Sequence, residues 1–218
     1  MKLELLRSKA RHNDLEVEHL LNAAKARTPG LAAELQRLSH ELGWSHTPHL
    51  ADGSHVVPLA RWAEVAGAYA EDGFDGLAPL AKDPACTSYV TSLLESLRSA
   101  EALDALLRFY ADRIAHPAAD AAAAWQLVPT CNLLVSIKGS VVPDERQAAV
   151  LRDFLVGFHA VATDEHQKAY VLYALRGVGD AASLDWIDTL ADLSWPYAEA
   201  KAQALKAIRK RLKARTAE

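Results

Sequence analysis

The sequence predicts an all-α fold, a right-handed solenoid of antiparallel helix pairs, on three observations. Apolar residues in the segment 169–192 recur at steps of three and four on both sides of a glycine-rich turn. The same pattern occurs at 87–109, where Tyr89 precedes Tyr170 by 81 residues. No part of the chain requires a β-strand, so stacked helix pairs account for the whole pattern.

The segment 169–192 is expected to form two helices joined by a tight turn. The first helix has an apolar face of Tyr170, Val171, Ala174, Leu175 and Val178. Gly177 and Gly179 are expected to end it, and Asp180 to begin the second helix. The apolar face of that second helix is Leu184, Ile187, Leu190 and Ala191.

A gapless register relates this segment to two others. It places Tyr89, Val90 and Leu94 on Tyr170, Val171 and Leu175, and Leu103 on Leu184. At an offset of 30 residues, Ala204 and Leu205 fall on Ala174 and Leu175, so the last helix looks like the second half of another unit. Leu175 and Leu205 are therefore both expected in the core. Further helices are expected around 118–138 and around 144–160, the latter starting at Pro143-Asp144-Glu145.

Before residue 59 the pattern differs. Residues 1–58 are expected to form a helical pair, with starts at Asn13-Asp14 and Thr28-Pro29, followed by an irregular loop at 44–58. Residues 59–218 would form the helical repeats, within one continuous domain. They begin with a helix at 61–69, a turn at 71–76 and a short apolar piece at 77–80.

The segment 174–187 has the pattern A-L-x-x-x-G-D-A-x-x-L-x-x-(I/L), which resembles a HEAT-type repeat of the short variety, with about 30 residues per unit. The resemblance covers about residues 60–212 and is strongest at 169–208. It implies a binding scaffold, because proteins of this class usually act in that way. Some bacterial members are immunity or adaptor proteins, and one enzymatic branch comprises alkylpurine DNA glycosylases.

Charge is distributed unevenly along the chain. Residues 201–218 contain seven of the 24 Lys and Arg residues and one of the 28 Asp and Glu residues, which leaves 17 basic and 27 acidic residues, a net of −10, in the rest. An acidic body favours a basic protein partner over nucleic acid, whose binding requires many phosphate contacts. The basic end has an equally good structural explanation, since cations near a helix carboxyl end favour the macrodipole.

Composition places further limits on the class of protein. No apolar run approaches the roughly 20 residues that cross a bilayer, so no membrane association is expected. Cys86 and Cys131 lie in apolar helical contexts and are expected to be reduced, buried thiols, as in a cytoplasmic protein.

Two groups of histidines with nearby carboxylates could support catalysis. His46, His49 and His55, with Asp52 among them, supply zinc-ligand chemistry for a metal-dependent hydrolase, but an ordinary polar loop explains them better. A second group, around the turn before the segment 169–192, is His159, Asp164, Glu165 and His166. It could do acid–base work but lacks a nucleophile, and a helix cap at Thr163 or Asp164 explains the carboxylates. No metal or cofactor is expected.

Acidic side chains beside aromatic ones give the main functional hypothesis. Asp185, Asp188 and Asp192 share one helical face, with Trp186 at its border and Asp180 at its start. A second group is Glu71, Asp72, Phe74 and Asp75, which follow Tyr69. Either group could be only a solvated surface. As binding surfaces they fit a partner rich in Arg and Lys.

These observations predict a non-enzymatic binding module whose acidic face grips a basic protein. An immunity protein that occludes the substrate groove of a cognate toxin is one such role, and electrostatic steering would speed the encounter. The alternative from the enzymatic branch is an alkylpurine DNA glycosylase using Trp125, Trp186 and Asp185, against which the acidic body argues.

Overall fold

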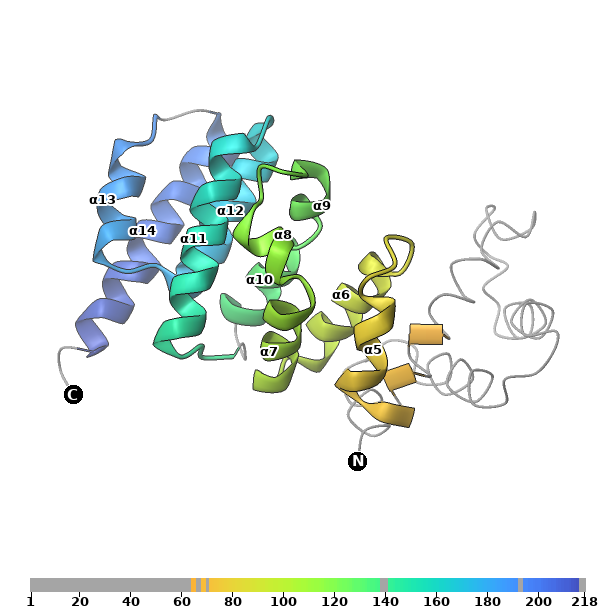
Figure 1. Ribbon diagram of the computed structural model, residues 1–218. Helices are drawn as coiled ribbons and strands as arrows, with labels where there is room; N and C mark the ends of the chain where they lie inside the picture. Colours follow the sequence, from red (N-terminus) through yellow and green to blue (C-terminus); the bar gives the residue numbers. More distant parts are fainter. Residues whose placement is uncertain (1–63, 66–67, 70, 138–140, 192–193, 216–218) are drawn as a thin grey trace, which may run out of the picture. The chain divides into compact units, whose positions relative to one another are not determined.

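The computed structural model describes residues 64–65, 68–69, 71–137, 141–191 and 194–215 (Figure 1). Helices, turns and loops account for all of these residues, with no strand among them, so the predicted all-α class is confirmed. The chain divides into two compact units, of which the first ends at Leu97 and the second begins at Arg98. The expected boundary at residue 58 lies outside the described residues.

The described part of the first unit contains α5 (Phe74–Leu80) and α6 (Thr87–Leu97). The expected turn at 71–76 is mostly helical, because Glu71 and Asp72 are in a helix and α5 starts at Phe74. Only Gly73 interrupts the helix, with a φ of 65°, a conformation that glycine adopts without steric cost. Leu77 of α5 is fully buried, as the expected apolar piece at 77–80 requires.

The second unit contains eight described helices: α7 (Ala100–Phe109), α8 (Ala111–Ala115), α9 (Ala121–Trp125), α10 (Val128–Val135), α11 (Glu145–Val161), α12 (Glu165–Val178), α13 (Ala181–Thr189) and α14 (Trp195–Arg215). The helix expected around 144–160 is α11. The helix expected around 118–138 is two helices, α9 and α10, and Pro129 lies in the first turn of the second. The short helix α8 was not predicted.

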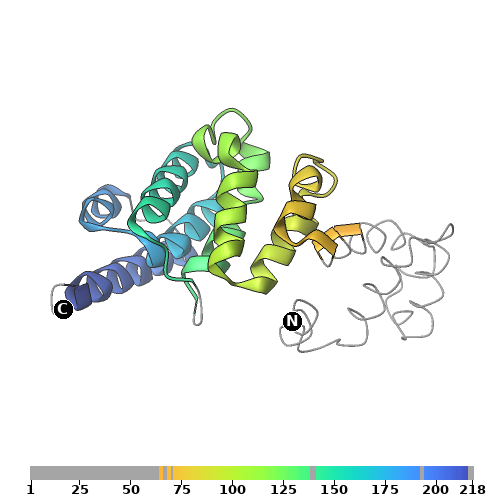
Figure 2. The ribbon, with the colours of Figure 1, turned by 60° about the horizontal axis from the view of Figure 1, so that its bottom comes forward.

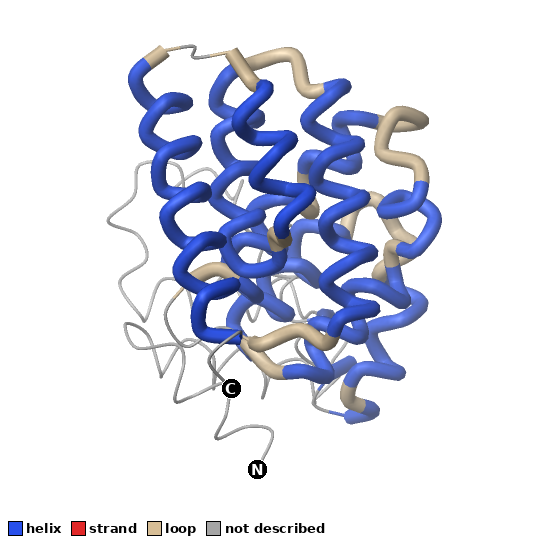
Figure 3. Tube along the Cα trace, turned by 90° about the vertical axis from the view of Figure 1, so that its left-hand side faces the viewer, coloured by secondary structure: helices blue, strands red, loops and turns tan. Residues whose placement is uncertain are grey.

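Helix α12 packs against α10, α11 and α14 in the middle of this unit (Figure 1), whose described residues are all in helices, turns and loops (Figure 3). Val171, Leu172, Ala174 and Leu175 are completely buried there. Complete burial of a leucine side chain contributes about 2 kcal/mol, so this helix supplies much of the core.

Hydrogen bonds at the two ends of α12 fix the directions of its neighbours. Ser194, just before α14, donates its backbone N–H to Glu165 at the start of α12. Gly179, just after α12, lies against Ile208 near the end of α14, so the two helices run in the same direction. Helix α11 runs the opposite way, since its Arg152 donates to the carbonyl of Val178 at 3.0 Å. Helix α13 packs against α14 (Figure 2).

Helix α10 also runs parallel to α12, and Gly177 allows the two helices to touch. The hydroxyl of Ser136, just after α10, donates to the carbonyl of Ala174 at 2.6 Å and accepts from the N–H of Gly177 at 3.1 Å. A methyl group on Gly177 would overlap the carbonyl of Val135. The prediction that Gly177 ends the helix is wrong, because α12 continues to Val178 and only Gly179 lies beyond it.

Aspartate caps begin three helices where the sequence predicted them. Asp144, Asp164 and Asp180 accept backbone N–H groups three residues later, at 2.7, 2.8 and 2.8 Å, at the starts of α11, α12 and α13. Ser99 caps α7 in the same way at 3.2 Å. Ser99 and Asp180 are 81 residues apart, so the register inferred from the apolar residues extends to the caps.

Burial agrees with the expectations at the cysteines and at Leu175, but not at Leu205 or along α13. On the predicted apolar face of α13, Ile187 is buried, whereas Leu184 and Leu190 are partly exposed and Ala191 is exposed beyond the end of the helix. Cys86 and Cys131 are free and buried. Leu175 is fully buried, whereas Leu205 is partly exposed, because α14 has its buried side at Ala200, Ala204 and Ile208. In the part of the chain described here, no helix combines the length and apolar character needed to cross a membrane.

Candidate protein-binding face

The predicted acidic stripe is present in part. Asp185 and Asp188 are exposed on α13, while Asp192 falls outside the described residues, beyond the end of the helix at Thr189. The carboxylate of Asp188 lies 3.7 Å from the guanidinium of Arg209 on α14, and both side chains are 56% exposed. An exposed pair of this kind holds its charges loosely. The described part of the stripe is therefore solvated, with a weak ion pair between Asp188 and Arg209.

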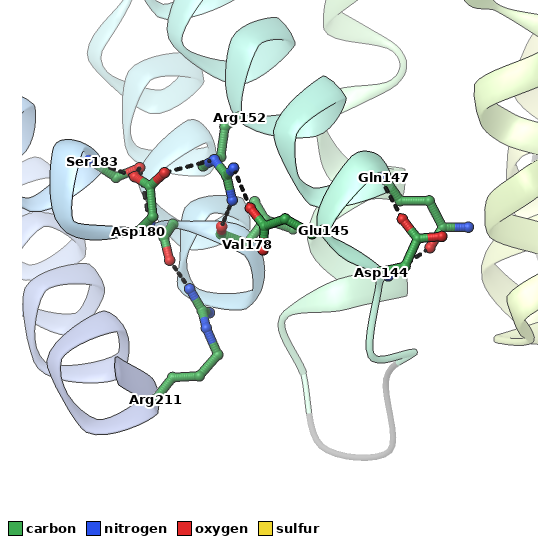
Figure 4. Close-up of polar contacts among 9 residues, drawn as sticks. Asp144, Glu145, Gln147, Arg152, Val178, Asp180, Ser183 and Arg211 are labelled. Carbon is green, nitrogen blue, oxygen red and sulfur yellow. Dashed lines mark hydrogen bonds and ion pairs between the residues drawn. The ribbon is translucent and has the colours of Figure 1, made fainter. Parts of the chain in front are cut away.

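Asp180, predicted at the start of that stripe, belongs to a network of charges at the carboxyl end of α12 (Figure 4). Its carboxylate lies 3.1 Å from Arg152, which also pairs with Glu145 at 2.8 Å. Burial raises the pKa of Asp180, but hydrogen bonds from Ser183 and the charge of Arg152 outweigh this, and the pKa is lowered overall. Asp180 thus remains ionised and joins α11 to the start of α13.

Two cations from the basic segment 201–218 bind backbone carbonyls at the ends of helices. Arg211 of α14 donates to the backbone carbonyls of Arg176 and Gly179 at the end of α12 (Figure 4). Lys201 donates to the carbonyl of Leu190, just after α13, at 2.6 Å. A cation at a helix carboxyl end satisfies carbonyls that lack helical partners. Arg211 and Lys201 therefore have the structural role expected of cations near the carboxyl end of a helix.

The two histidines expected for acid–base work have different surroundings, because His159 is buried and His166 is exposed. His159 is buried on α11, with its Nε2 3.0 Å from the hydroxyl of Tyr197 and its ring centroid 5.0 Å from that of Trp186. Burial, together with the positive charge of Lys168, lowers the pKa of His159 to about 4. Its imidazole is therefore neutral near pH 7 and serves as a core hydrogen-bonding group. Asp164 caps α12, as expected.

The second acidic group lies in the first unit. Glu71, Asp72 and Asp75 are exposed around the start of α5. Phe74 is partly exposed and packs edge-on against the buried ring of Tyr69, with centroids 5.3 Å apart. These residues form a polar surface with one aromatic contact beneath it.

The remaining predicted candidates are the histidines expected in the loop at 44–58 and the tryptophans of the alternative glycosylase. His46, His49 and His55 fall outside the described residues. Among the residues that the structure describes, no three His, Cys, Asp or Glu side chains converge in a way that could hold a metal ion. The ring of Trp125 stacks on that of Phe158, with centroids 6.1 Å apart, whereas Trp186 contacts His159. The two tryptophans of the alternative glycosylase therefore pack against different residues.

The structure shows a different surface that sequence reasoning missed, which we call the aromatic face: Trp125, His166, Tyr170 and Tyr173. His166 is exposed, and the other three rings are partly exposed. The ring of Trp125 lies 5.6 Å from that of Tyr170 and 6.1 Å from that of His166. Tyr170 lies 6.1 Å from Tyr173 at an interplanar angle of 83°. The rings therefore form one continuous row along the outward side of α12.

Arg176 fixes the carboxyl-terminal end of this row. Its guanidinium lies 5.0 Å from the ring centroid of Tyr173, and its Nε donates to the Tyr173 carbonyl at 2.9 Å. Its Nη1 donates to Gln203 of α14 at 3.1 Å, and its Nη2 to Asn132 of α10 at 3.3 Å. Burial lowers the pKa of Arg176, although it remains a cation. One side chain thus joins three parallel helices beneath the aromatic face.

The signal of this surface in the sequence was weak. His166, Tyr170 and Tyr173 follow at steps of four and three, which places them on one side of a helix. Tyr170 was assigned to the buried side because it also fits the apolar pattern of α12. Trp125 comes from another helix, so only the fold brings it to the row.

Comparison with known proteins adds no family to these observations. No family model matches the chain, and no curated protein or solved structure is detectably similar to it.

Proposed function

We propose that this chain is a non-enzymatic protein-binding module that binds its partner through the aromatic face. The observation that carries the proposal is the row of touching, partly exposed rings on the outward side of α12. Such a side of a helix is normally polar, because partly exposed rings leave apolar area in water. Trp, Tyr and Arg are the residue types that dominate the binding energy of protein interfaces.

The rigidity of the face supports a binding role. Arg176 holds α10, α12 and α14 together through side-chain hydrogen bonds, and each ring rests against the next. Side chains that are ordered before binding lose little conformational entropy when the partner docks. A tyrosine also offers a large contact area with only two rotatable side-chain bonds.

The helix arrangement supports the scaffold architecture that we propose, a HEAT-like solenoid. Helices α10, α12 and α14 run side by side in one direction, while α11 and α13 connect them in the chain. In such an arrangement one layer of parallel helices presents a continuous surface for a partner. Three of the four rings of the aromatic face come from α12 in that layer, and the fourth, Trp125, comes from α9.

As a narrower role we propose neutralisation of a basic toxin in the cytoplasm, by an immunity protein that covers the toxin's substrate groove. The acidic body of the chain supports this role through electrostatic steering, and Asp185 and Asp188 are exposed to take part in it. In that arrangement the carboxylates would speed the encounter, and the aromatic face would set the lifetime of the complex.

The proposal can be tested by site-specific photo-crosslinking in the cells that express the protein. A photoreactive phenylalanine analogue would replace Tyr173, and in separate variants Asp185 or the exposed Ala111 of α8. We expect one protein to be crosslinked in high yield from position 173, in lower yield from position 185 and not from position 111. Equal yields from all three positions, or no crosslinked protein, would contradict the proposal.

The toxin role has its own test once a crosslinked partner is known. Co-expression of the chain should restore the growth of cells that produce the partner. The Tyr170→Ala variant should restore growth less well, and the matched Ala111→Ser variant as well as the unmodified chain. A partner that is harmless when produced alone would exclude the toxin role while leaving the binding role intact.

A further inference from the structure

We infer that the partner docks on the aromatic face with a cationic side chain, arginine or lysine, an inference that rests on the proposed function. The faces of aromatic rings carry partial negative charge and attract cations that lie over them. Trp125, Tyr170 and Tyr173 each keep part of their surface exposed. Their nearly perpendicular pairs, at 84° and 83°, leave ring faces turned in more than one direction along the row.

Carboxylates lie at both borders of the face. Glu165 is exposed at the start of α12, next to His166 in the chain, and its Oε2 accepts from the N–H of Ser194 at 3.2 Å. Glu199 of α14 accepts from the side chain of Gln203 at 3.0 Å, and Gln203 in turn accepts from Arg176. Each carboxylate has further lone pairs for a partner's cation.

The cation that borders the aromatic face at Tyr173, Arg176, is already engaged by the protein. Each of its three guanidinium nitrogens donates to a carbonyl oxygen of the chain, and its plane lies over Tyr173. Three of its five N–H groups are thus committed to the chain, and these bonds hold the guanidinium between α10 and α14. The carboxylates of Glu165 and Glu199 are the charges that a docking cation would meet, and the exposed Lys206 and Lys210 lie farther along α14, beyond Gln203.

An exposed tryptophan lies near the start of α12. Trp195, the first residue of α14, is 75% exposed, and the hydrogen bond between Ser194 and Glu165 places the start of α14 beside the start of α12. Indole binds cations more strongly than the other aromatic side chains. A basic segment that lies along α12 can thus place one cation among the tyrosines and another near Trp195.

The test is selection of ligands from a random library of 12-residue peptides displayed on phage, with the full chain immobilised. We expect the enriched peptides to carry Arg or Lys. The best peptide would then be synthesised, together with a copy in which citrulline replaces each arginine, or norleucine each lysine. These replacements remove the charge and keep the length of the side chain. We expect the neutral copy to bind at least tenfold more weakly.

Variants of the chain assign the peptide to the face. Tyr170→Ala should weaken binding at least tenfold and Tyr170→Phe less than threefold, since phenylalanine keeps the ring. Glu199→Gln should weaken binding severalfold at low salt. The matched variant Asp153→Asn, at an exposed carboxylate of α11, should change it less than twofold. Unchanged thermal melting of Tyr170→Ala would show that the fold is intact.

The possible failures are distinguishable. Enriched peptides that need Tyr170 but contain no cation, or whose neutral copies bind equally well, would overturn the cationic inference and leave the binding function standing. Peptides that bind Tyr170→Ala as well as the unmodified chain would overturn this inference and remove the aromatic face from the proposed function. A selection without enrichment would also overturn the inference.

Discussion

Helices α12 and α13 follow each other in the chain, and each exposes one side, but the two surfaces are built differently. On α12 the exposed rings touch one another, and Arg176 joins them to α10 and α14. On α13 the exposed carboxylates of Asp185 and Asp188 project separately, and the one ion pair, to Arg209, spans 3.7 Å between half-exposed groups. The first surface is fixed in place, whereas the second is solvated.

This difference separates two contributions to binding. Exposed carboxylates act over a Debye length of about 8 Å at physiological salt and mainly accelerate encounters. Ordered aromatic rings act only on contact, and they determine how slowly the complex dissociates. A charge pattern visible in the sequence therefore need not mark the place where a partner is held.

The largest expected effect tests the core beneath the aromatic face. Leu175→Ala should lower the free energy of unfolding by about 2–5 kcal/mol, because it leaves a cavity under α12. Leu205→Ala, at the equivalent position of α14, should cost about 1 kcal/mol or less, since that side chain is partly exposed. Urea unfolding of both variants measures the difference. Equal losses would show that α14 is as deeply packed as α12.

The second prediction concerns the core under α13, where Trp186 rests on His159. Because the pKa of His159 is lowered from 6.5 to about 4 in the folded protein, the unfolded chain binds the proton first as the pH falls. The contribution of His159 to stability is therefore complete above pH 6.5 and is lost between pH 6.5 and pH 4. The loss amounts to at most about 3 kcal/mol.

Urea unfolding at several pH values measures this loss. His159→Gln should be less stable near pH 7 but should lose less stability between pH 6.5 and pH 4 than the unmodified chain. The comparison removes the contribution of the carboxylates, which titrate in both proteins. Parallel pH profiles would mean that His159 already binds its proton in the folded protein near pH 6.5, despite Lys168 and the hydrogen bond to Tyr197.

The third prediction concerns the close contact between α12 and α10. Gly177→Ala should cost about 1–3 kcal/mol, because its methyl group would overlap the carbonyl of Val135 and push the helices apart. Gly157→Ala in α11 is the matched control, since its methyl group would meet only side-chain carbons of Pro117, the nearer at 3.2 Å. There the gain in helix propensity offsets the crowding, and stability should change by less than about 1 kcal/mol. Thermal unfolding compares the two variants.

Much of the fold was predictable because the signals are local. Asp144, Asp164 and Asp180 cap their helices through backbone groups three residues away, and the apolar spacing of α12 identifies most of its buried residues, with Tyr170 as the exception. The structural environments of Gly177 and Leu205 were not predictable from local signals. A glycine in a helix looks like a stop until the approach of α10 is known, and Leu205 depends on which side of α14 meets α12.

The candidate site was less predictable than the fold. Tyr170 satisfies the apolar period of α12, yet its ring lies at the surface, and periodicity does not distinguish a border position from a core position. Trp125 and Tyr170 become neighbours only through the packing of the helices. The acidic stripe was visible because charge is written directly in the sequence, although exposure alone does not make it a binding site.

The smallest expected effect quantifies the contrast between α12 and α13. A double-mutant cycle on Asp188 and Arg209, each changed to Ala, should give a coupling of about 0.5 kcal/mol or less, because both side chains are 56% exposed. The same cycle on Arg176 and Gln203 should give about 1 kcal/mol, since that hydrogen bond involves a charged, half-buried donor. Added salt should reduce the first coupling more than the second. If the coupling on α13 proved the larger, its carboxylates would be ordered before a partner arrives, and the distinction between a steering surface and a holding surface would fail.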